Sequence, residues 1–310
     1  MKLKPIIDGI ISFIPGARDC KKYGTGGTCS ARYCYSVWLH HLVMAEINGL
    51  NTSPRVVAEL GPGDSLGVGL SALLSGSNKY FAFDIVQYAS NEKNLQIFEE
   101  LISLLKNKTP IPSQTEFPEL RPSLPNYEFP AHILTPERLQ TSLHPNRISQ
   151  IRYSILNPYS SESLIQYKVP WNSEVIIEKE SVDMILSQAV LEHVDNLEET
   201  YKAMYQWLAP DGYISHQIDF KSHHLTEEWN EHWTYPEFLW KIIRGKRPYL
   251  INREPLSTHI NILKQIGFKI VCNKTVQTPS NITRQKLASK FKYLTDEDLI
   301  TSGTFIQAKK

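Results

Sequence analysis

Cysteine is scarce in this chain, with 4 residues among 310, and no C-x-x-C pair occurs. Cys29 and Cys34 precede His40 and His41, but this spacing matches none of the usual zinc motifs. The cysteines therefore predict neither a disulfide scaffold nor a metal site. We expect no metal among the site residues, and buried, reduced thiols in a cytoplasmic protein.

An excess of charge of one sign is also missing, because 33 Lys and Arg face 32 Asp and Glu. Nucleic-acid-binding chains usually carry a basic excess, so we expect no nucleic-acid partner. No run of about 18 apolar residues occurs, so we expect no membrane span. Asp8 and Pro15 interrupt the apolar N-terminal stretch, which therefore does not read as a signal peptide.

What the sequence does contain is an alternation of short apolar runs and amphipathic segments. Strands are expected at 55–60, 80–85, 164–169, 182–187, 212–220, 268–271 and 304–308. The helical periodicity predicts helices at 30–48, 91–105, 197–208, 235–244 and 256–266. Ser30 and Asn91 are candidate caps of the first two helices. This order indicates an α/β fold with a mostly parallel sheet.

Proline interrupts the alternation between Thr109 and Pro158, where nine prolines occur. No continuous helix or strand can run through that density. We expect an insertion at about 108–162 that wraps the surface or covers a site. The predicted organisation is an N-terminal helical cap at 1–54 and one catalytic domain at 55–310.

A glycine turn follows the first predicted strand, in the segment Glu59-Leu60-Gly61-Pro62-Gly63-Asp64. Such a turn, opening a helix, lets the backbone approach a ligand closely. The dinucleotide fingerprint would need glycine where Leu66 stands, and no G-K-[ST] follows. A second acid, Asp84, closes the next strand, at the edge of the sheet where open α/β folds bind ligands.

These segments resemble the class I S-adenosylmethionine-dependent methyltransferases, in particular the branch called type 11. The likeness covers roughly residues 55–90 and 163–220, including the stretches 183–194 and 207–213. It implies a Rossmann-like, mostly parallel seven-stranded sheet with an antiparallel last strand and helices on both faces. It also implies S-adenosylmethionine as the cofactor, bound by Glu59, Gly61, Pro62, Gly63, Asp64, Asp84, Ile85, Trp171, Ser187 and Gln188.

Alternatives exist for several of these residues. Glu59 and Asp84 could be strand-end carboxylates satisfied by backbone amides, and Trp171 could be a core residue. An adenine N-methyltransferase would need an N/D-P-P-Y/F segment after the fourth strand. The nearest approximation, Asn157-Pro158-Tyr159, precedes the third strand, which argues against a nucleic-acid adenine as substrate.

Histidines gather around the fifth predicted strand, and methylation of a hydroxyl requires a base near neutral pH. His223 follows the end of this strand and is the expected general base, with Asp219 orienting it or the acceptor. His216, inside the strand, is the second choice, and His193 is expected to have an orienting role. His216, Asp219 and His223 could alternatively be metal ligands, although their spacing is not distinctive.

The acceptor is suggested by Trp229, Trp233 and Trp240, followed by Arg244, Lys246, Arg247 and Arg253. Aromatic faces and guanidinium groups suit an acidic sugar, whereas the alternative is a packed helix with a solvated basic end. Asn252-Arg253 and the helix after it also resemble methyltransferases of bacterial surface-polysaccharide pathways.

We therefore expect O-methylation of a sugar or glycan precursor. The alternatives are another small metabolite, a lipid-linked acceptor, or a non-catalytic methyltransferase-like partner protein. The oligomeric state does not follow from the sequence.

Overall fold

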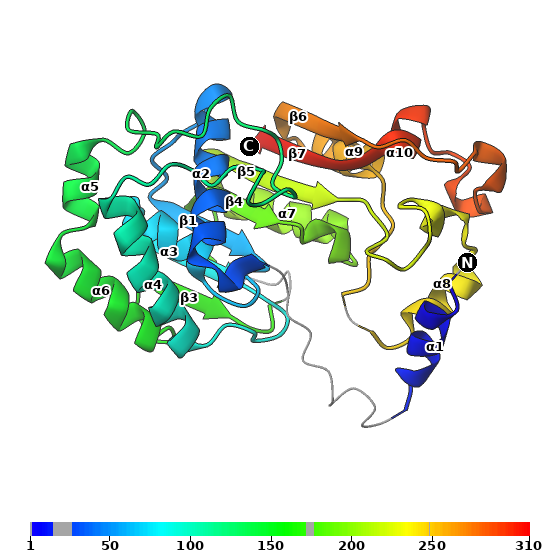
Figure 1. Ribbon diagram of the computed structural model, residues 1–310, viewed down its shortest axis with the longest axis horizontal. Helices are drawn as coiled ribbons and strands as arrows, with labels where there is room; N and C mark the ends of the chain where they lie inside the picture. The colour runs from blue at the N-terminus through cyan, green and yellow to red at the C-terminus, as the bar shows by residue number, and fades with distance from the viewer. Residues whose placement is uncertain (1, 15–26, 172–176, 248) are drawn as a thin grey trace.

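A seven-stranded sheet crosses the molecule in the computed structural model, which describes residues 2–14, 27–171, 177–247 and 249–310 (Figure 1). The strand order is β3-β2-β1-β4-β5-β7-β6, in which β1 to β5 run parallel and β7 is antiparallel to both neighbours. The fold class predicted from the sequence is confirmed. The strands are β1 Val56–Leu60, β2 Lys79–Phe83, β3 Ile165–Lys168, β4 Val182–Gln188, β5 Leu208–Asp219, β6 Lys269–Gln277 and β7 Thr301–Lys309.

Alternating side chains divide the core between the two faces of the sheet. Val57 and Tyr80 pack with helices α2 Ala31–Ile47, α3 Gly67–Leu74 and α4 Asn91–Lys106. Ala58 and Phe81 point the other way, toward α7 Leu197–Trp207 and α9 Leu256–Ile266. The central strands are buried on both faces, which explains why they read as continuous apolar runs.

Side-chain caps set the starts of the two longest helices. Ser30 caps α2 as predicted, since its hydroxyl accepts a hydrogen bond from the Tyr33 amide at 3.3 Å. The cap of α4 is Ser90 and not Asn91, which corrects the sequence prediction by one residue. Ser90 has an extended backbone and its hydroxyl accepts from the Lys93 amide at 3.2 Å, whereas Asn91 already belongs to the helix.

The proline-rich insertion contains two helices, α5 Pro136–Ser142 and α6 Pro145–Leu156. Each begins with proline at its first position, where the helix needs no amide donor. Proline thus limits the length of these helices without excluding them. Both pack outside α3, and α6 also contacts α4 (Figure 1).

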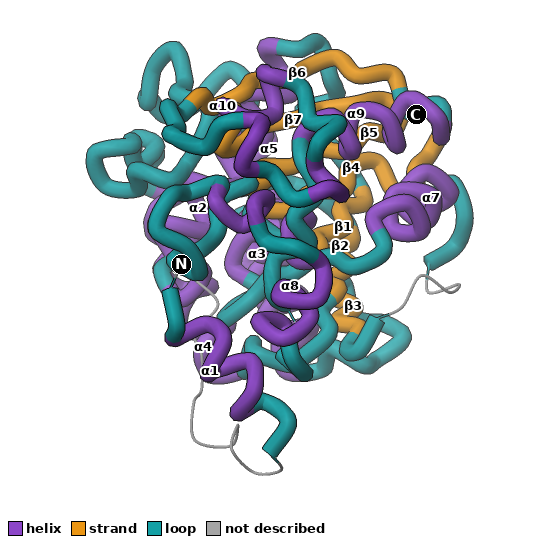
Figure 2. The backbone as a smooth tube through the Cα atoms, turned by 90° about the vertical axis from the view of Figure 1, so that its right-hand side faces the viewer, coloured by secondary structure: helices purple, strands orange, loops and turns teal. Residues whose placement is uncertain are grey.

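The two N-terminal helices lie in different parts of the molecule. Helix α2 belongs to the layer that covers the sheet, whereas α1 Lys4–Ile11 packs against α8 Glu237–Arg244 beyond it (Figure 2). Gly9 permits this contact, because a Cβ atom there would lie 2.0 Å from the carbonyl oxygen of Ile242. A short helix, α10 Asp296–Ile300, precedes β7.

Two further expectations concern the membrane and the thiols. Across the described ranges, the helices fall short of the length and apolar character that a bilayer crossing requires. Cys34 and Cys272 are buried thiols outside any disulfide, as expected, but Cys29 is exposed. Cys20 lies outside the described residues.

Candidate functional site

The glycine loop after β1 bends sharply at the carboxyl edge of the sheet. Gly61 and Gly63 have positive φ angles of 64° and 74°, a conformation that favours glycine. A Cβ atom on Gly61 would also lie 2.6 Å from a methyl group of Val190. The Gly61 amide donates to the Phe83 carbonyl at 2.8 Å and thereby fixes the loop beside the end of β2, with Pro62 buried in the turn.

Asp84 follows β2 directly and stands next to this loop. Its carboxylate accepts a hydrogen bond from the Ile85 amide at 2.8 Å. Burial raises the pKa of Asp84, and the amides of Ile85, Val86 and Gly63 oppose that rise. The side chains of Ile85 and Val86 are 44% and 40% exposed, so an apolar surface adjoins the acid.

These residues fit S-adenosylmethionine. A carboxylate can accept hydrogen bonds from two ribose hydroxyls, and exposed apolar side chains suit one face of a purine. Val190 occupies the space where a Gly61 side chain would lie, so the turn accepts no side chain at this position. The Trp171 amide donates to the Asp84 carbonyl at 3.0 Å, while its ring packs against Phe83 and Trp207.

Other predicted cofactor residues are engaged within the protein. Glu59 is 2% exposed and accepts a hydrogen bond from the Tyr80 hydroxyl at 2.5 Å. Burial raises the pKa of Glu59 to about 8. The Asp64 amide donates to the Thr28 hydroxyl at 2.9 Å, so an N-terminal segment closes one side of the loop.

The start of α3 also differs from an open anion site. The Leu66 amide donates to the Asn94 side chain at 2.9 Å, and the Gly67 amide donates to the Ser65 hydroxyl at 3.1 Å. Two backbone amides that the sequence predicted to be available to a ligand therefore donate to side chains of the protein instead.

Ser187 and His216 form a buried pair on neighbouring strands. The Ser187 hydroxyl lies 2.8 Å from His216 Nδ1, and both side chains are fully buried. Burial lowers the pKa of His216 to about 3. Gln188 ends β4 opposite Gln217 and is half-buried.

Asp219 is the last residue of β5, and His223 lies beside it in the loop that follows. His223 Nε2 is 3.5 Å from Asp219 Oδ2, and the His223 side chain is 34% exposed. His223 has a φ angle of 48°, in the left-handed region. Burial opposes ionisation of Asp219, but His223 and Lys221 outweigh it and lower the pKa of that carboxyl.

A short turn, Leu191–His193, brings two more side chains to this pair. The rings of His193 and His223 lie 5.0 Å apart in an edge-to-face arrangement. Ligand atoms of Glu192, His193 and His223 all lie within 4.8 Å of one another. The Asn252 amide donates to the Glu192 carbonyl at 2.7 Å and holds the turn in place.

Sequence reasoning missed Glu192, although it quoted the Leu-Glu-His segment. The side chain is 2% exposed, and neither carboxylate oxygen has a hydrogen-bond partner of normal geometry within the described chain. Burial raises the pKa of Glu192 well above its usual value, and nearby backbone amides offset only part of this rise. The only sequence signal was its position directly after β4.

The aromatic and basic stretch is structural. Trp233 and Trp240 are buried, and the Arg253 guanidinium lies between the rings of Trp240 and Phe291 at 4.5 and 4.8 Å. Arg244 pairs with Asp195. The packed alternative weighed from the sequence therefore describes this segment, because its guanidinium groups serve internal contacts.

The insertion reaches the site through residues 119–121. The Gln217 side chain donates to the Glu119 carbonyl at 2.8 Å and accepts from the Arg121 amide at 2.8 Å. Lys221 Nζ lies 3.3 Å from the Glu119 carboxylate. This part of the insertion borders the carboxyl end of β5.

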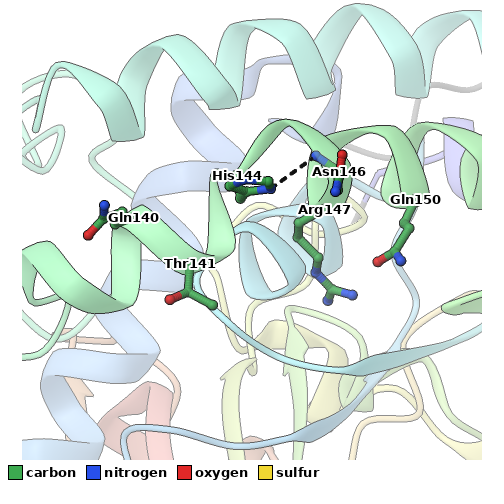
Figure 3. Close-up of a pocket in the computed structure, with 6 residues that line it drawn as sticks. All are labelled: Gln140, Thr141, His144, Asn146, Arg147 and Gln150. Atoms are coloured by element: carbon green, nitrogen blue, oxygen red, sulfur yellow. Dashed lines mark hydrogen bonds between the residues drawn. The ribbon is translucent and has the colours of Figure 1, made fainter.

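A separate hollow lies between α5 and α6 (Figure 3). His144 Nδ1 accepts from the Asn146 amide at 3.3 Å, and Arg147 donates to the Ser77 carbonyl. None of the predicted site residues lines it. The lining residues are Gln140, Thr141, His144, Asn146, Arg147 and Gln150.

Comparison with known families gives a match to the methyltransferase domain family over residues 43–273. The chain belongs to this family. The match spans the glycine loop, Asp84 and the histidine cluster. It confirms the predicted enzyme class, an S-adenosylmethionine-dependent methyltransferase.

Solved structures similar to this methyltransferase include an S-adenosylmethionine-dependent methyltransferase from Mesorhizobium loti. The identity is 12%, the match covers 83% of this chain and 91% of that one, and the TM-score is 0.40. An S-adenosylmethionine-dependent methyltransferase from Methanosarcina mazei is 12% identical, the match covers 86% of this chain and 96% of that one, and the TM-score is 0.45. Phosphoethanolamine N-methyltransferase 2 from Haemonchus contortus, solved with S-adenosylmethionine, is 12% identical. That match covers 90% of this chain and 56% of that one, with a TM-score of 0.42. The comparison with curated proteins found no match.

Proposed function

We propose that this methyltransferase transfers a methyl group from S-adenosylmethionine to a hydroxyl of a sugar or glycan precursor. One observation carries the proposal: an imidazole and a carboxylate, His223 and Asp219, lie 3.5 Å apart beyond the strand that ends beside β4. Chemistry in open α/β sheets gathers at this edge. A basic group there suits an oxygen nucleophile that must lose a proton.

The cofactor site in this proposal is the edge formed by the ends of β1, β2 and β4. Asp84 would bind the ribose hydroxyls, and Ile85 and Trp171 would flank the adenine. The turn Gly61-Pro62-Gly63 gives backbone access to the amino-acid part. Glu59, Asp64, Ser187 and Gln188 complete the proposed set from beneath and beside the turn.

S-adenosylmethionine, when bound, supplies a methyl group on a positively charged sulfur, which is a good leaving group. His223 takes the proton of the acceptor hydroxyl as the new oxygen–carbon bond forms and the carbon–sulfur bond breaks. Asp219 holds the imidazole and stabilises the imidazolium that results. His216 is the reserve candidate for the base. Its complete burial and its hydrogen bond to Ser187 favour His223.

The remaining parts of the chain have proposed supporting roles. Residues 1–54 act as a cap on a catalytic domain of residues 55–310. The insertion at about 108–162 forms a wall of the acceptor site through Glu119 and Arg121, which contact Gln217. The acceptor class fits an enzyme of surface-polysaccharide synthesis in the cytoplasm.

The test is methyl transfer from labelled S-adenosylmethionine to a panel of nucleotide sugars. His223→Ala should lower turnover by about two to four orders of magnitude, the range for a positioned base, with cofactor affinity retained. His224→Ala is the matched control, since the neighbouring imidazole lies outside the cluster. Unchanged turnover in His223→Ala at every pH would refute this role and transfer it to His216 or His193.

A further inference from the structure

We propose that Glu192, His193 and His223 bind a divalent transition-metal ion, with Asp219 orienting His223 behind it. The site comes from two places in the chain. The turn after β4 provides Glu192 and His193, and the loop after β5 provides His223. Its role in catalysis rests on the proposed O-methylation, whereas the binding of the ion does not.

Glu192 gives the strongest argument. Its side chain is 2% exposed, and in the part of the chain that the structure describes neither carboxylate oxygen has a hydrogen-bond partner of normal geometry, so its burial is costly. Such groups are usually paired with a charge or coordinate a metal. Lys221 forms its ion pairs with Asp219 and Glu119, and its charge offsets only a small part of the effect of burial on Glu192. The nearest groups that could share a cation with Glu192 are the two imidazoles.

The geometry is close to that of a metal site. Ligand atoms of the three side chains lie within 4.8 Å of one another. Nitrogen and oxygen ligands at about 2.0–2.2 Å from a tetrahedral zinc ion are separated by about 3.5 Å. A movement of about 1 Å therefore closes the site, and the His223 side chain, at 34% exposure, has room for it.

Asp219 provides the outer support that such sites have. Metal-binding histidines commonly donate their second ring N–H to a carboxylate. His223 Nε2 lies 3.5 Å from Asp219 Oδ2, so this contact can fix the ring and leave Nδ1 as the nitrogen for the ion. Among the described residues, the buried His193 Nδ1 has no hydrogen-bond partner.

The donor set selects the class of ion. Two imidazoles and one carboxylate suit ions such as zinc, cobalt or manganese rather than calcium, which prefers oxygen ligands only. Three protein ligands leave an open position for an oxygen of the acceptor.

A hydroxyl bound at that position loses its proton more readily, and the proton leaves to solvent as the oxygen takes the methyl group. In this state His223 acts as a ligand, and the ion replaces the free imidazole in activating the same hydroxyl.

Binding is tested by titrating the chelator-treated full chain with cobalt chloride, followed by visible absorption and calorimetry. We expect one equivalent to bind and a tetrahedral cobalt spectrum. His193→Ala and His223→Ala should each weaken binding at least tenfold, whereas His224→Ala should bind as the unaltered protein does. Glu192→Gln should also weaken it. If that variant does not fold, the two histidine variants decide. Equal cobalt affinity in all variants would overturn the proposal.

Activity separates this inference from the proposed function. If cobalt binds as expected but no nucleotide sugar is methylated with or without ion, the metal site stands and the acceptor class is wrong. If sugars are methylated at full rate by the chelator-treated enzyme and cobalt does not bind, the proposed function stands and the metal site is wrong.

Discussion

A single carboxylate, Asp84, carries the clearest prediction about the cofactor. Asp84→Ala should weaken the binding of S-adenosylmethionine about ten- to hundredfold, because the charge-assisted hydrogen bonds lost contribute roughly 1.5–3 kcal/mol in total. Calorimetry with S-adenosylmethionine measures this change. Glu100→Ala, on the exposed face of α4, is the control and should bind normally. A folded Asp84→Ala protein with unchanged affinity would remove Asp84 from the site.

Residues differ in how far the sequence could predict them. The proximity of Asp219 and His223 follows from the sequence, because three residues separate them at the end of one strand, whereas their catalytic roles stay predictions. Glu192 could not be assigned, because its burial depends on the loop that Asn252 holds against it, about sixty residues later. Arg253 was predicted to contact the acceptor. The sequence does not show that its guanidinium packs on the rings of Trp240 and Phe291, which come from distant segments.

At the scale of an element, the turn between β1 and α3 should tolerate no side chain at Gly61. Gly61→Ala faces a positive φ, which costs about 1–2 kcal/mol, and a contact with Val190 that adds about 1–3 kcal/mol. We expect a loss of about 2–5 kcal/mol in the free energy of unfolding by urea titration.

A double variant separates the two costs at this turn. Gly61→Ala combined with Val190→Ala removes the contact and leaves the backbone strain. The loss of stability caused by Gly61→Ala should therefore be smaller in the Val190→Ala protein than in the unaltered protein. If Gly61→Ala is as stable as the unaltered protein, the described turn geometry is wrong.

Elements were predicted well where local patterns decide them. The strands and the longer helices appear at the expected places, because buried parallel strands and amphipathic helices have distinct periods. The insertion was harder, since nine prolines hide two helices that each begin on a proline. Whether a proline ends a helix or starts one depends on the packing of the residues that follow, and α3 and α4 provide that packing.

For the whole molecule, buried titratable groups predict how stability depends on pH. Burial lowers the pKa of six histidines to about 3 or 4, from 6.5. The unfolded chain therefore binds more protons below pH 6.5, and stability falls as the pH decreases from there toward 4. The six are His40, His41, His193, His216, His232 and His259.

Glu59 has the opposite effect. Its pKa is about 8 in the folded protein against 4.5, so the folded state holds the extra proton and stability falls as the pH rises from 4.5 to 8. Glu192, whose pKa burial also raises, acts in the same direction as Glu59. Six histidines outweigh these two glutamates below pH 6.5, and the glutamates act without them above it. The melting temperature should therefore be highest near pH 6.5.

Calorimetric melting between pH 4.5 and 8.5 measures this profile. Glu59→Gln should reduce the decline above pH 6.5 and make the rise between pH 4.5 and 6.5 steeper, because Glu59 opposes that rise in the unaltered protein. A melting temperature that does not change between pH 5 and 6.5 would mean that these histidines are not buried in the neutral form.

The position of β7 in the sheet has a consequence for how the protein folds during its synthesis. β7 lies between β5 and β6, although it is made after both, and its residues are buried along nearly the whole strand. While the ribosome is still translating, β5 and β6 each keep an open edge, a state prone to wrong pairing and attractive to chaperones. The parallel half can assemble earlier. Closure of the sheet therefore waits for the last strand, and a chain interrupted before residue 301 would be a substrate for degradation rather than a partly active enzyme.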